Sequence, residues 1–171
     1  MEQYNHITYM ERIAENLRDI AHTAKRQRFF KSTGIASLEG IFANLNNLNF
    51  PCVIAEDNCD SRLYDNHSDS IREFPFFTFY VLYQASAGND DEILNARKNA
   101  RSTANKILSR MLRDANDDEI GNEYGIRIMD FSSVRMQGVG PLGDNGHGVM
   151  VTFTLQHEAP IDYDTNDWFD E

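Results

Sequence analysis

The sequence predicts an α+β fold, with a mixed or antiparallel sheet of about four strands backed by two longer helices and carrying a long glycine-rich β-hairpin loop. Apolar residues recur at every third or fourth position over 7–24 and 93–112, which is the period of an amphipathic helix. Residues 74–84 and 149–157 instead follow the two-residue period of strands.

The length and charge of the chain limit what it can be. Its 171 residues suit one α+β domain, which we place at 1–159, followed by an acidic and aromatic C-terminal interaction arm at 160–171. With 16 Lys and Arg against 27 Asp and Glu, the net charge of −11 argues against binding to nucleic acid or to anionic membranes. The N-terminus lacks the pattern of a signal peptide, and no apolar run is long enough for a membrane span.

The first third of the chain predicts two helices. The first covers Ile7–Ala24, about five turns, and is followed by cations that complement the helix dipole. These cations are Lys25, Arg26, Arg28 and Lys31. Ser37 is placed to cap a second, shorter helix, which Pro51 closes. Its apolar stripe consists of Leu38, Ile41, Phe42, Leu45 and Leu48.

The middle of the chain alternates between apolar and very polar segments. Cys52–Ala55 reads as a short strand, and Glu56–Glu73 as a long exposed loop with a possible short strand near Leu63 and Tyr64. Phe74–Gln84 is apolar on both faces of a strand. We therefore expect a helix layer to cover one face, and a second layer or a neighbouring subunit to cover the other.

The second half predicts a long helix and a hairpin. Asn89 or Asp90 can cap the helix, whose alanine-rich stripe allows close packing on a sheet. Two strand patterns follow, at 126–136 and 149–157, and residues 138–148 between them hold five glycines and a proline. We interpret 138–148 as a loop long enough to reach a neighbour.

Several motifs suggest chemistry but have simpler explanations. Residues 138–143 match G-x-G-x-x-G, yet strands flank them, whereas a dinucleotide site needs those glycines to open a helix. Cys52, Cys59 and His67 lack the paired spacing of zinc ligands, and the acidic loop lacks EF-hand spacing. The two cysteines suit a reducing compartment, although the sequence leaves a disulfide between them open. We expect no catalytic, cofactor-binding or metal site, and no enzyme.

The order of elements resembles the tail terminator, tail-completion and head–tail joining proteins of tailed bacteriophages. The resemblance covers residues 7–159 and rests on the strand FPFFTFYVL at 74–82, the helix at 96–112, and the pairing of 134–136 with 149–155. It implies an α+β subunit that assembles as a ring, of six or twelve copies, around the DNA path. It also implies a place in the virion, and in the host cytoplasm during assembly.

The resemblance and the residues together suggest how such a ring would be built. Its partners would be further copies, and neighbouring tail, portal or adaptor proteins, while DNA passes through without specific binding and no membrane is involved. The candidate subunit-interface residues are Tyr163, Trp168, Phe169, Arg97, Arg101, Arg110, Val139 and Leu142. The candidate channel-facing acids are Asp57, Asp60 and Asp117.

Two other functions stay open on the sequence. One is a monomeric protein-binding adaptor of a mobile element or injection apparatus, which would use the C-terminal aromatics on a single partner. The other is a small enzyme or nucleotide-binding protein that uses the glycine-rich segment.

Overall fold

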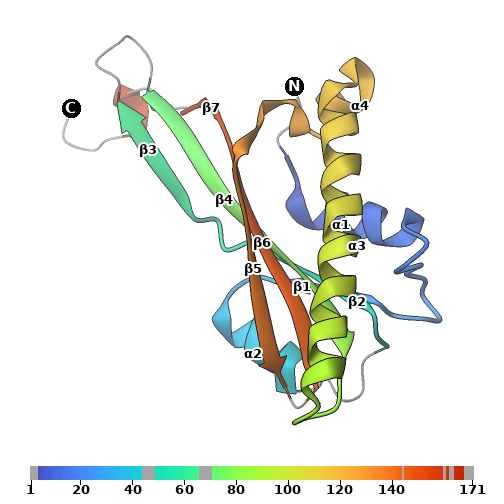
Figure 1. Cartoon of the computed structure of the whole chain (residues 1–171). Helices are drawn as coiled ribbons and strands as arrows, with labels where there is room; N and C mark the ends of the chain where they lie inside the picture. The colour runs from blue at the N-terminus through green and yellow to red at the C-terminus, as the bar shows by residue number, and fades with distance from the viewer. Residues whose placement is uncertain are drawn as a thin grey trace.

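The computed structural model confirms an α+β fold, but its mixed sheet has seven strands rather than about four (Figure 1). The structure describes residues 4–43, 49–65, 71–143, 145–159, 161 and 164–167. The helices are α1 (His6–Asn16), α2 (Ile35–Ala43), α3 (Asp90–Asn116) and α4 (Asp118–Glu123), with short 3-10 turns η2 (Ile126–Ile128) and η3 (Thr165–Asp167). The strands are β1 (Phe29–Ser32), β2 (Cys52–Glu56), β3 (Ser61–Asp65), β4 (Ile71–Gln84), β5 (Met129–Leu142), β6 (Gly146–Leu155) and β7 (His157–Glu158).

Strand β4 organises the whole sheet. In the body of the sheet the strands follow the order β1-β2-β4-β6-β5, and β4 takes part with its second half. Strands β1 and β2 are parallel, and the other neighbouring pairs are antiparallel. The first half of β4 pairs instead with β3 on one side and β7 on the other. One continuous strand therefore joins the body of the domain to a narrower ribbon.

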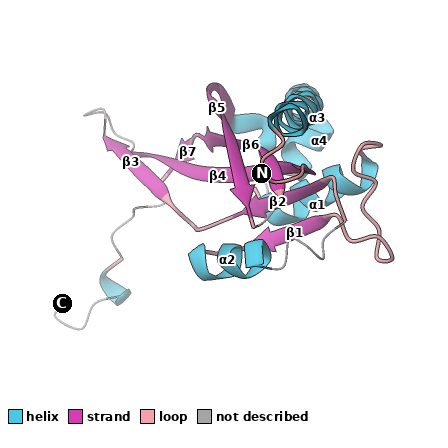
Figure 2. Cartoon of the chain, turned by 60° about the horizontal axis from the view of Figure 1, so that its bottom comes forward, coloured by secondary structure: helices cyan, strands magenta, loops and turns pink. Residues whose placement is uncertain are grey.

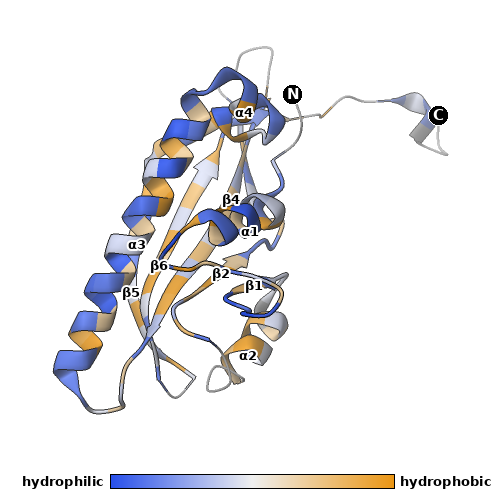
Figure 3. Cartoon of the chain, turned by 90° about the vertical axis from the view of Figure 1, so that its right-hand side faces the viewer, coloured by the Kyte–Doolittle hydropathy of each residue, from blue (hydrophilic) through white to orange (hydrophobic). Residues whose placement is uncertain are grey.

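The main core lies between this sheet and the helices α1 and α3. Phe79 and Val81 of β4 and Val151 and Phe153 of β6 are buried there. Buried alanines let α3 approach the sheet closely, as its sequence predicts: these are Ala96, Ala100 and Ala104. Figure 3 shows the largely hydrophilic outer side of α3, and Figure 2 shows α3 and α2 on opposite sides of the sheet.

The second face of β4 is covered only in part. Tyr80 and Leu82 pack with Cys52 and Ile54 of β2 in a second apolar cluster. Three residues of α2 cover this cluster, namely Leu38, Ile41 and Phe42. The expected second layer is therefore α2, but it covers the half of β4 that lies in the body.

The first helix is shorter than its sequence predicts, because α1 ends at Asn16 rather than at Ala24. Ala21 has a left-handed backbone with φ of 48°, which no helix can continue through. The buried guanidinium of Arg28 donates to the carbonyl oxygens of Ile20 at 3.0 Å and Phe50 at 2.6 Å. Arg28 thus ties two chain segments together instead of complementing a helix dipole.

Two features near the second helix also differ from prediction. Residues 29–32 form β1, a parallel edge strand that the sequence reading assigned to the basic end of the first helix. The second helix begins at Ile35, so Ser37 lies inside it and does not cap it. Leu45 and Leu48 lie outside the described residues.

The glycine-rich segment is not the long loop that we expected. Strand β5 continues to Leu142 and β6 begins at Gly146, so most of 138–148 is paired strand. The register shifts between Val139 and Leu142, where Gly140 has φ of 116°. Such a bulge, with proline on an edge strand, explains why the composition resembles a loop.

The polar segment at 56–73 is also more ordered than expected. It contains β3 and the start of β4, which pair from Ser61↔Pro75 to Asp65↔Ile71. Residues 66–70 lie outside the described part of the chain. The acidic stretch at 114–123 forms the end of α3 and all of α4.

Candidate subunit interface

A narrow arm extends from the body of the domain, and β7 pairs with its β4 strand at Arg72 and Glu73 (Figure 1). We define the arm as β3 and the half of β4 that pairs with it, residues 71–75. Every residue of β3 is exposed, and the side chains of Leu63 and Tyr64 are 54% and 51% exposed. Strands usually bury at least one face against a core, so an arm that exposes both needs another surface to cover it.

Contacts within the arm hold its side chains in place without burying them. The rings of Tyr64 and Phe74 meet edge to face with centroids 6.4 Å apart. The guanidinium of Arg62 lies 5.3 Å from the centroid of the Phe74 ring, on its face. The arm therefore presents an ordered mixture of apolar and basic groups.

A pocket of about 300 Å³ lies at the base of the arm. Phe76 stands beside it with 43% of its side chain exposed, on the face of β4 that α2 covers further along. The polar and charged residues around it come from β3, β5 and β6: Arg62, Asp130, Ser133, Arg135, Thr152 and Thr154. We call this uncovered surface the open face.

Strand β3 at the edge of the arm and strand β5 at the edge of the sheet each have one free edge. Within the described residues, β3 pairs only with β4, and β5 pairs only with β6. A bulge between Asp130 and Arg135 interrupts β5 next to the open face. Ser133 closes that bulge, since its hydroxyl donates to the Asp130 carbonyl oxygen at 2.6 Å and accepts the Thr154 amide at 2.9 Å. Free strand edges are sites where another chain can add.

The three arginines predicted at the interface have different surroundings. Arg97 donates to the carbonyl oxygen of Gly140 at 3.3 Å, which links α3 to β5. Arg110 forms an ion pair with Asp114 at 2.7 Å within α3. Arg101 is exposed and has no hydrogen bond or ion pair with another described residue.

The predicted apolar interface residues of the glycine-rich segment lie inside the domain. Val139 and Leu142 are half-buried and pack against the second apolar cluster under α2. The aromatic residues Tyr163, Trp168 and Phe169 fall outside the described residues. The short strand expected near Leu63 and Tyr64 is confirmed as β3, but the sequence did not predict its pairing with the start of β4 as an arm.

The three acids predicted to face a channel lie in two regions. Asp57 and Asp60 belong to the connection between β2 and β3, where the Asp57 carboxylate accepts the Cys59 amide at 3.0 Å. Asp117 caps α4 by accepting the amides of Glu119 and Ile120, both at 3.0 Å. Asp117 therefore has a local structural role, whereas the side chain of Asp60 is exposed.

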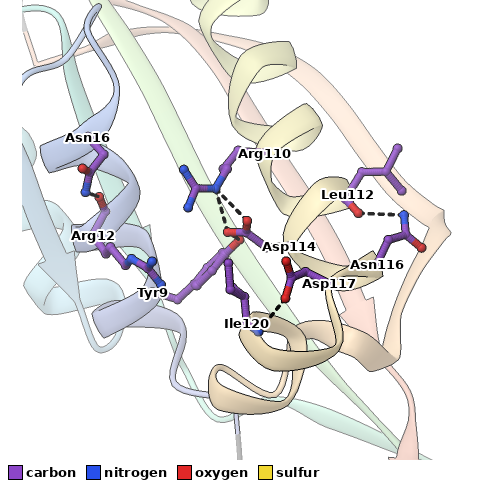
Figure 4. Close-up of polar contacts among 9 residues, drawn as sticks. All are labelled: Tyr9, Arg12, Asn16, Arg110, Leu112, Asp114, Asn116, Asp117 and Ile120. Atoms are coloured by element: carbon purple, nitrogen blue, oxygen red, sulfur yellow. Dashed lines mark hydrogen bonds and ion pairs between the residues drawn. The ribbon is translucent and has the colours of Figure 1, made fainter.

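Two groups of buried polar side chains hydrogen-bond within the domain. Asp114 accepts the Tyr9 hydroxyl at 3.0 Å and the Arg110 Nε at 2.7 Å, as Figure 4 shows. Burial, and then the Asp114 carboxylate, raise the pKa of Tyr9. On the α2 side, Tyr80 donates to the buried Glu56 at 3.0 Å. These groups pair with each other and lie away from the arm.

No described helix is both long enough and apolar enough to cross a membrane. Across the described ranges, no three His, Cys, Asp or Glu side chains lie together as metal ligands would. Cys52 is buried and Cys59 is exposed, and both are free thiols.

No protein-family model matches the chain, and a search of curated proteins finds no match either.

Proposed function

We propose that this chain is a structural virion subunit that forms a ring at the phage tail or head–tail connector, around the DNA path. The observation that carries the proposal is the arm, because β3 is exposed along its whole length with Leu63 and Tyr64 uncovered. An ordered, partly apolar ribbon of this kind is suited to packing on another protein surface.

Further copies of the chain are the partner that this geometry favours. The arm lies to one side of the body, whereas β5 offers a free edge at the far side of the sheet (Figure 1). Contacts between two different surfaces of identical copies are head-to-tail, and they close into a ring when the rotation permits. Neighbouring tail, portal or adaptor proteins would then contact the two ends of the ring.

The charge of the chain supports a passage for DNA rather than a binding site. With a net charge of −11, a ring of copies would repel phosphate and avoid the contacts that make DNA binding tight. Asp57 and Asp60, in the connection before the arm, are the acids that we place toward such a channel, together with Asp117.

Native mass spectrometry across protein concentration, followed by negative-stain imaging, tests the proposal. We expect closed rings for the wild type and their loss in Leu63→Asp. Leu94→Asp is the matched control, since Leu94 lies on α3 and is 52% exposed against 54% for Leu63. Both variants should keep the wild-type melting temperature.

Two outcomes would contradict the proposal. One is a ring that Leu63→Asp leaves intact, because the arm would then have no part in assembly. The other is a strict monomer that shows no binding to tail-tube or portal proteins. A strict monomer that binds one such protein through the arm would instead favour the monomeric adaptor.

A further inference from the structure

A small basic pocket lies between α1 and α3, on the side of the domain away from the arm. Its volume is about 120 Å³, and its walls include Ile13, Leu17 and Ile107. Its charged lining residues are Arg12 of α1 and Lys106, Arg110 and Asp114 of α3. Three cations line the pocket in a chain that is strongly acidic overall; Lys106 is paired with Asp19 at 2.6 Å and Arg110 with Asp114, whereas Arg12 has no ion pair with another described residue. We call this site the α1–α3 pocket.

The cations of the pocket retain unused hydrogen-bond donors. One terminal nitrogen of Arg12, Nη1, is buried and has no hydrogen-bond partner among the described residues. Arg110 uses its Nε on Asp114, and its terminal nitrogens have no hydrogen bond to another described residue. A buried charged donor without an acceptor is costly, so an added anion would stabilise this site.

Arg12 and Arg110 line the pocket from opposite helices. The guanidinium of Arg12 lies 4.5 Å from the centroid of the Tyr124 ring, which fixes its direction. Figure 4 shows the Arg12 and Arg110 side chains directed toward each other across the gap between α1 and α3, with Tyr9 and Asp114 beside them. Asp114 already accepts from Tyr9 and Arg110, so it does not satisfy Arg12 as well.

The size of the pocket selects the kind of anion. A volume of about 120 Å³ corresponds to roughly four water molecules, which suits a small anionic group such as one carboxylate side chain. Apolar walls beside the cations also favour a peptide, in which an apolar or aromatic residue follows the acid. Arginine and carboxylate form the strongest kind of charged hydrogen bond.

The C-terminal segment of the same sequence has this composition. Residues 160–171 contain five acids and three aromatics, namely Asp162, Asp164, Asp167, Asp170 and Glu171 with Tyr163, Trp168 and Phe169. Asp164 is exposed. In Figures 1 and 2, η3 (Thr165–Asp167) lies on the opposite side of the molecule from α3, so Asp164 does not meet the pocket of its own chain.

We propose that the α1–α3 pocket binds an acidic side chain from the C-terminal segment, residues 160–171, of a neighbouring copy. The contact rests on the proposed ring, and it joins a basic site on one side of each copy to an acidic segment on the other. Complementary charge of this kind fixes which surfaces meet and in what register.

Fluorescence anisotropy with a labelled peptide of residues 160–171 tests the pocket without requiring a ring. The receptor is the full chain with its five C-terminal acids changed to the corresponding amides, so that it cannot compete with the peptide. We expect saturable binding that weakens with added salt and falls at least tenfold in Arg12→Gln. Lys106→Gln should weaken it as well, and this lysine is 52% exposed, so its loss leaves the fold intact.

The control is Arg101→Gln, which removes an exposed cation of the same helix that has no partner among the described residues. It should leave binding unchanged, and a peptide with amides in place of its acids should not bind. Equal binding to the wild-type pocket and to Arg12→Gln and Lys106→Gln would overturn the inference, as would no binding at all. If rings form but the peptide does not bind, only this inference is contradicted. If the peptide binds but no rings form, only the proposed function is contradicted.

Discussion

Tyr9 and Asp114 are 105 positions apart in the sequence, yet the Tyr9 hydroxyl donates a 3.0 Å hydrogen bond to the Asp114 carboxylate inside the core. The bond joins α1 to the last turn of α3, and Asp114 is only 1% exposed. We expect Tyr9→Phe to lower the free energy of unfolding by about 1–3 kcal/mol, because it leaves one buried carboxylate oxygen with fewer donors. Urea denaturation measures the loss.

Asp114→Ala should cost more than Tyr9→Phe, about 3–5 kcal/mol, because it leaves Arg110 and Tyr9 without their shared acceptor. The double variant should lose less than the sum of the two single variants, since both remove the same bond. Strict additivity in urea denaturation would show that the bond contributes nothing in solution.

His6 is predicted to make stability depend on pH. It is fully buried, and burial lowers the pKa of His6 from 6.5 to about 4. Since a carbonyl only accepts, the His6 Nε2–H donates to Thr78 at 2.8 Å, and Nδ1 of the neutral ring accepts the Tyr4 hydroxyl at 3.0 Å. Protonation of Nδ1 would reverse the second bond and place a positive charge in the core.

The direction in which stability changes with pH follows from which state, folded or unfolded, binds the proton more readily. The unfolded chain takes up a proton at His6 near pH 6.5, whereas the folded chain resists it down to about pH 4. Stability contributed by His6 is therefore full above pH 6.5 and falls by roughly 3 kcal/mol as pH drops to 4. Ring resonances of His6 in an NMR titration that shift near pH 6.5 would contradict this.

Gly148 is predicted to tolerate no side chain. A Cβ there would lie 1.9 Å from the Val81 carbonyl oxygen of the neighbouring strand, so backbone would have to move. We expect Gly148→Ala to lower the free energy of unfolding by roughly 3 kcal/mol or more. Gly138→Ala is the matched control on β5, because its nearest neighbour would be Arg97 Cδ at 4.0 Å. Equal melting temperatures for the two variants would refute the close approach of β4 and β6.

The two cysteines should react very differently with a thiol reagent. Cys59 is exposed, whereas Cys52 is buried and its burial raises the pKa of that thiol to about 12. The thiolate is the reactive form, so the native protein should release one equivalent from Ellman's reagent rapidly at pH 8. Cys59→Ser should remove that equivalent, and unfolding in guanidinium should expose the second. Rapid reaction of both thiols in the native chain would contradict this burial.

The sequence predicted the parts of the fold that depend on local periodicity. The stripe of α3, its Asn89 cap and the two-sided burial of β4 are all confirmed, because each follows from residues close together in the chain. Strand β1 was missed, since four residues paired in parallel with a distant strand carry little local signal. The glycines of β5 and β6 were misread, because the close approach at Gly148 comes from Val81, far away in sequence.

The candidate site was harder to predict than the fold. The sequence indicated a second layer or a neighbouring subunit from the two apolar faces of residues 74–84, and the structure covers part of the second face with α2 but leaves Phe76 exposed. It predicted a short strand near Leu63 and Tyr64 but not the arm, because the pairing of that strand with β4 depends on residues 71–75, of which the sequence predicted only Phe74 and Pro75 to be strand. It also placed Arg110 among the interface residues, because no local pattern shows that Asp114 is buried and pairs with it.

The continuity of β4 also decides how the domain would bear mechanical load. The same strand runs from the arm into the middle of the sheet, where it pairs with β6 from Phe76↔Thr154 to Gln84↔Gly146. A pull along the arm would load these backbone hydrogen bonds together, in shear, instead of opening them one after another. A domain built in this way could hold a neighbour under tension without unravelling from the point of attachment.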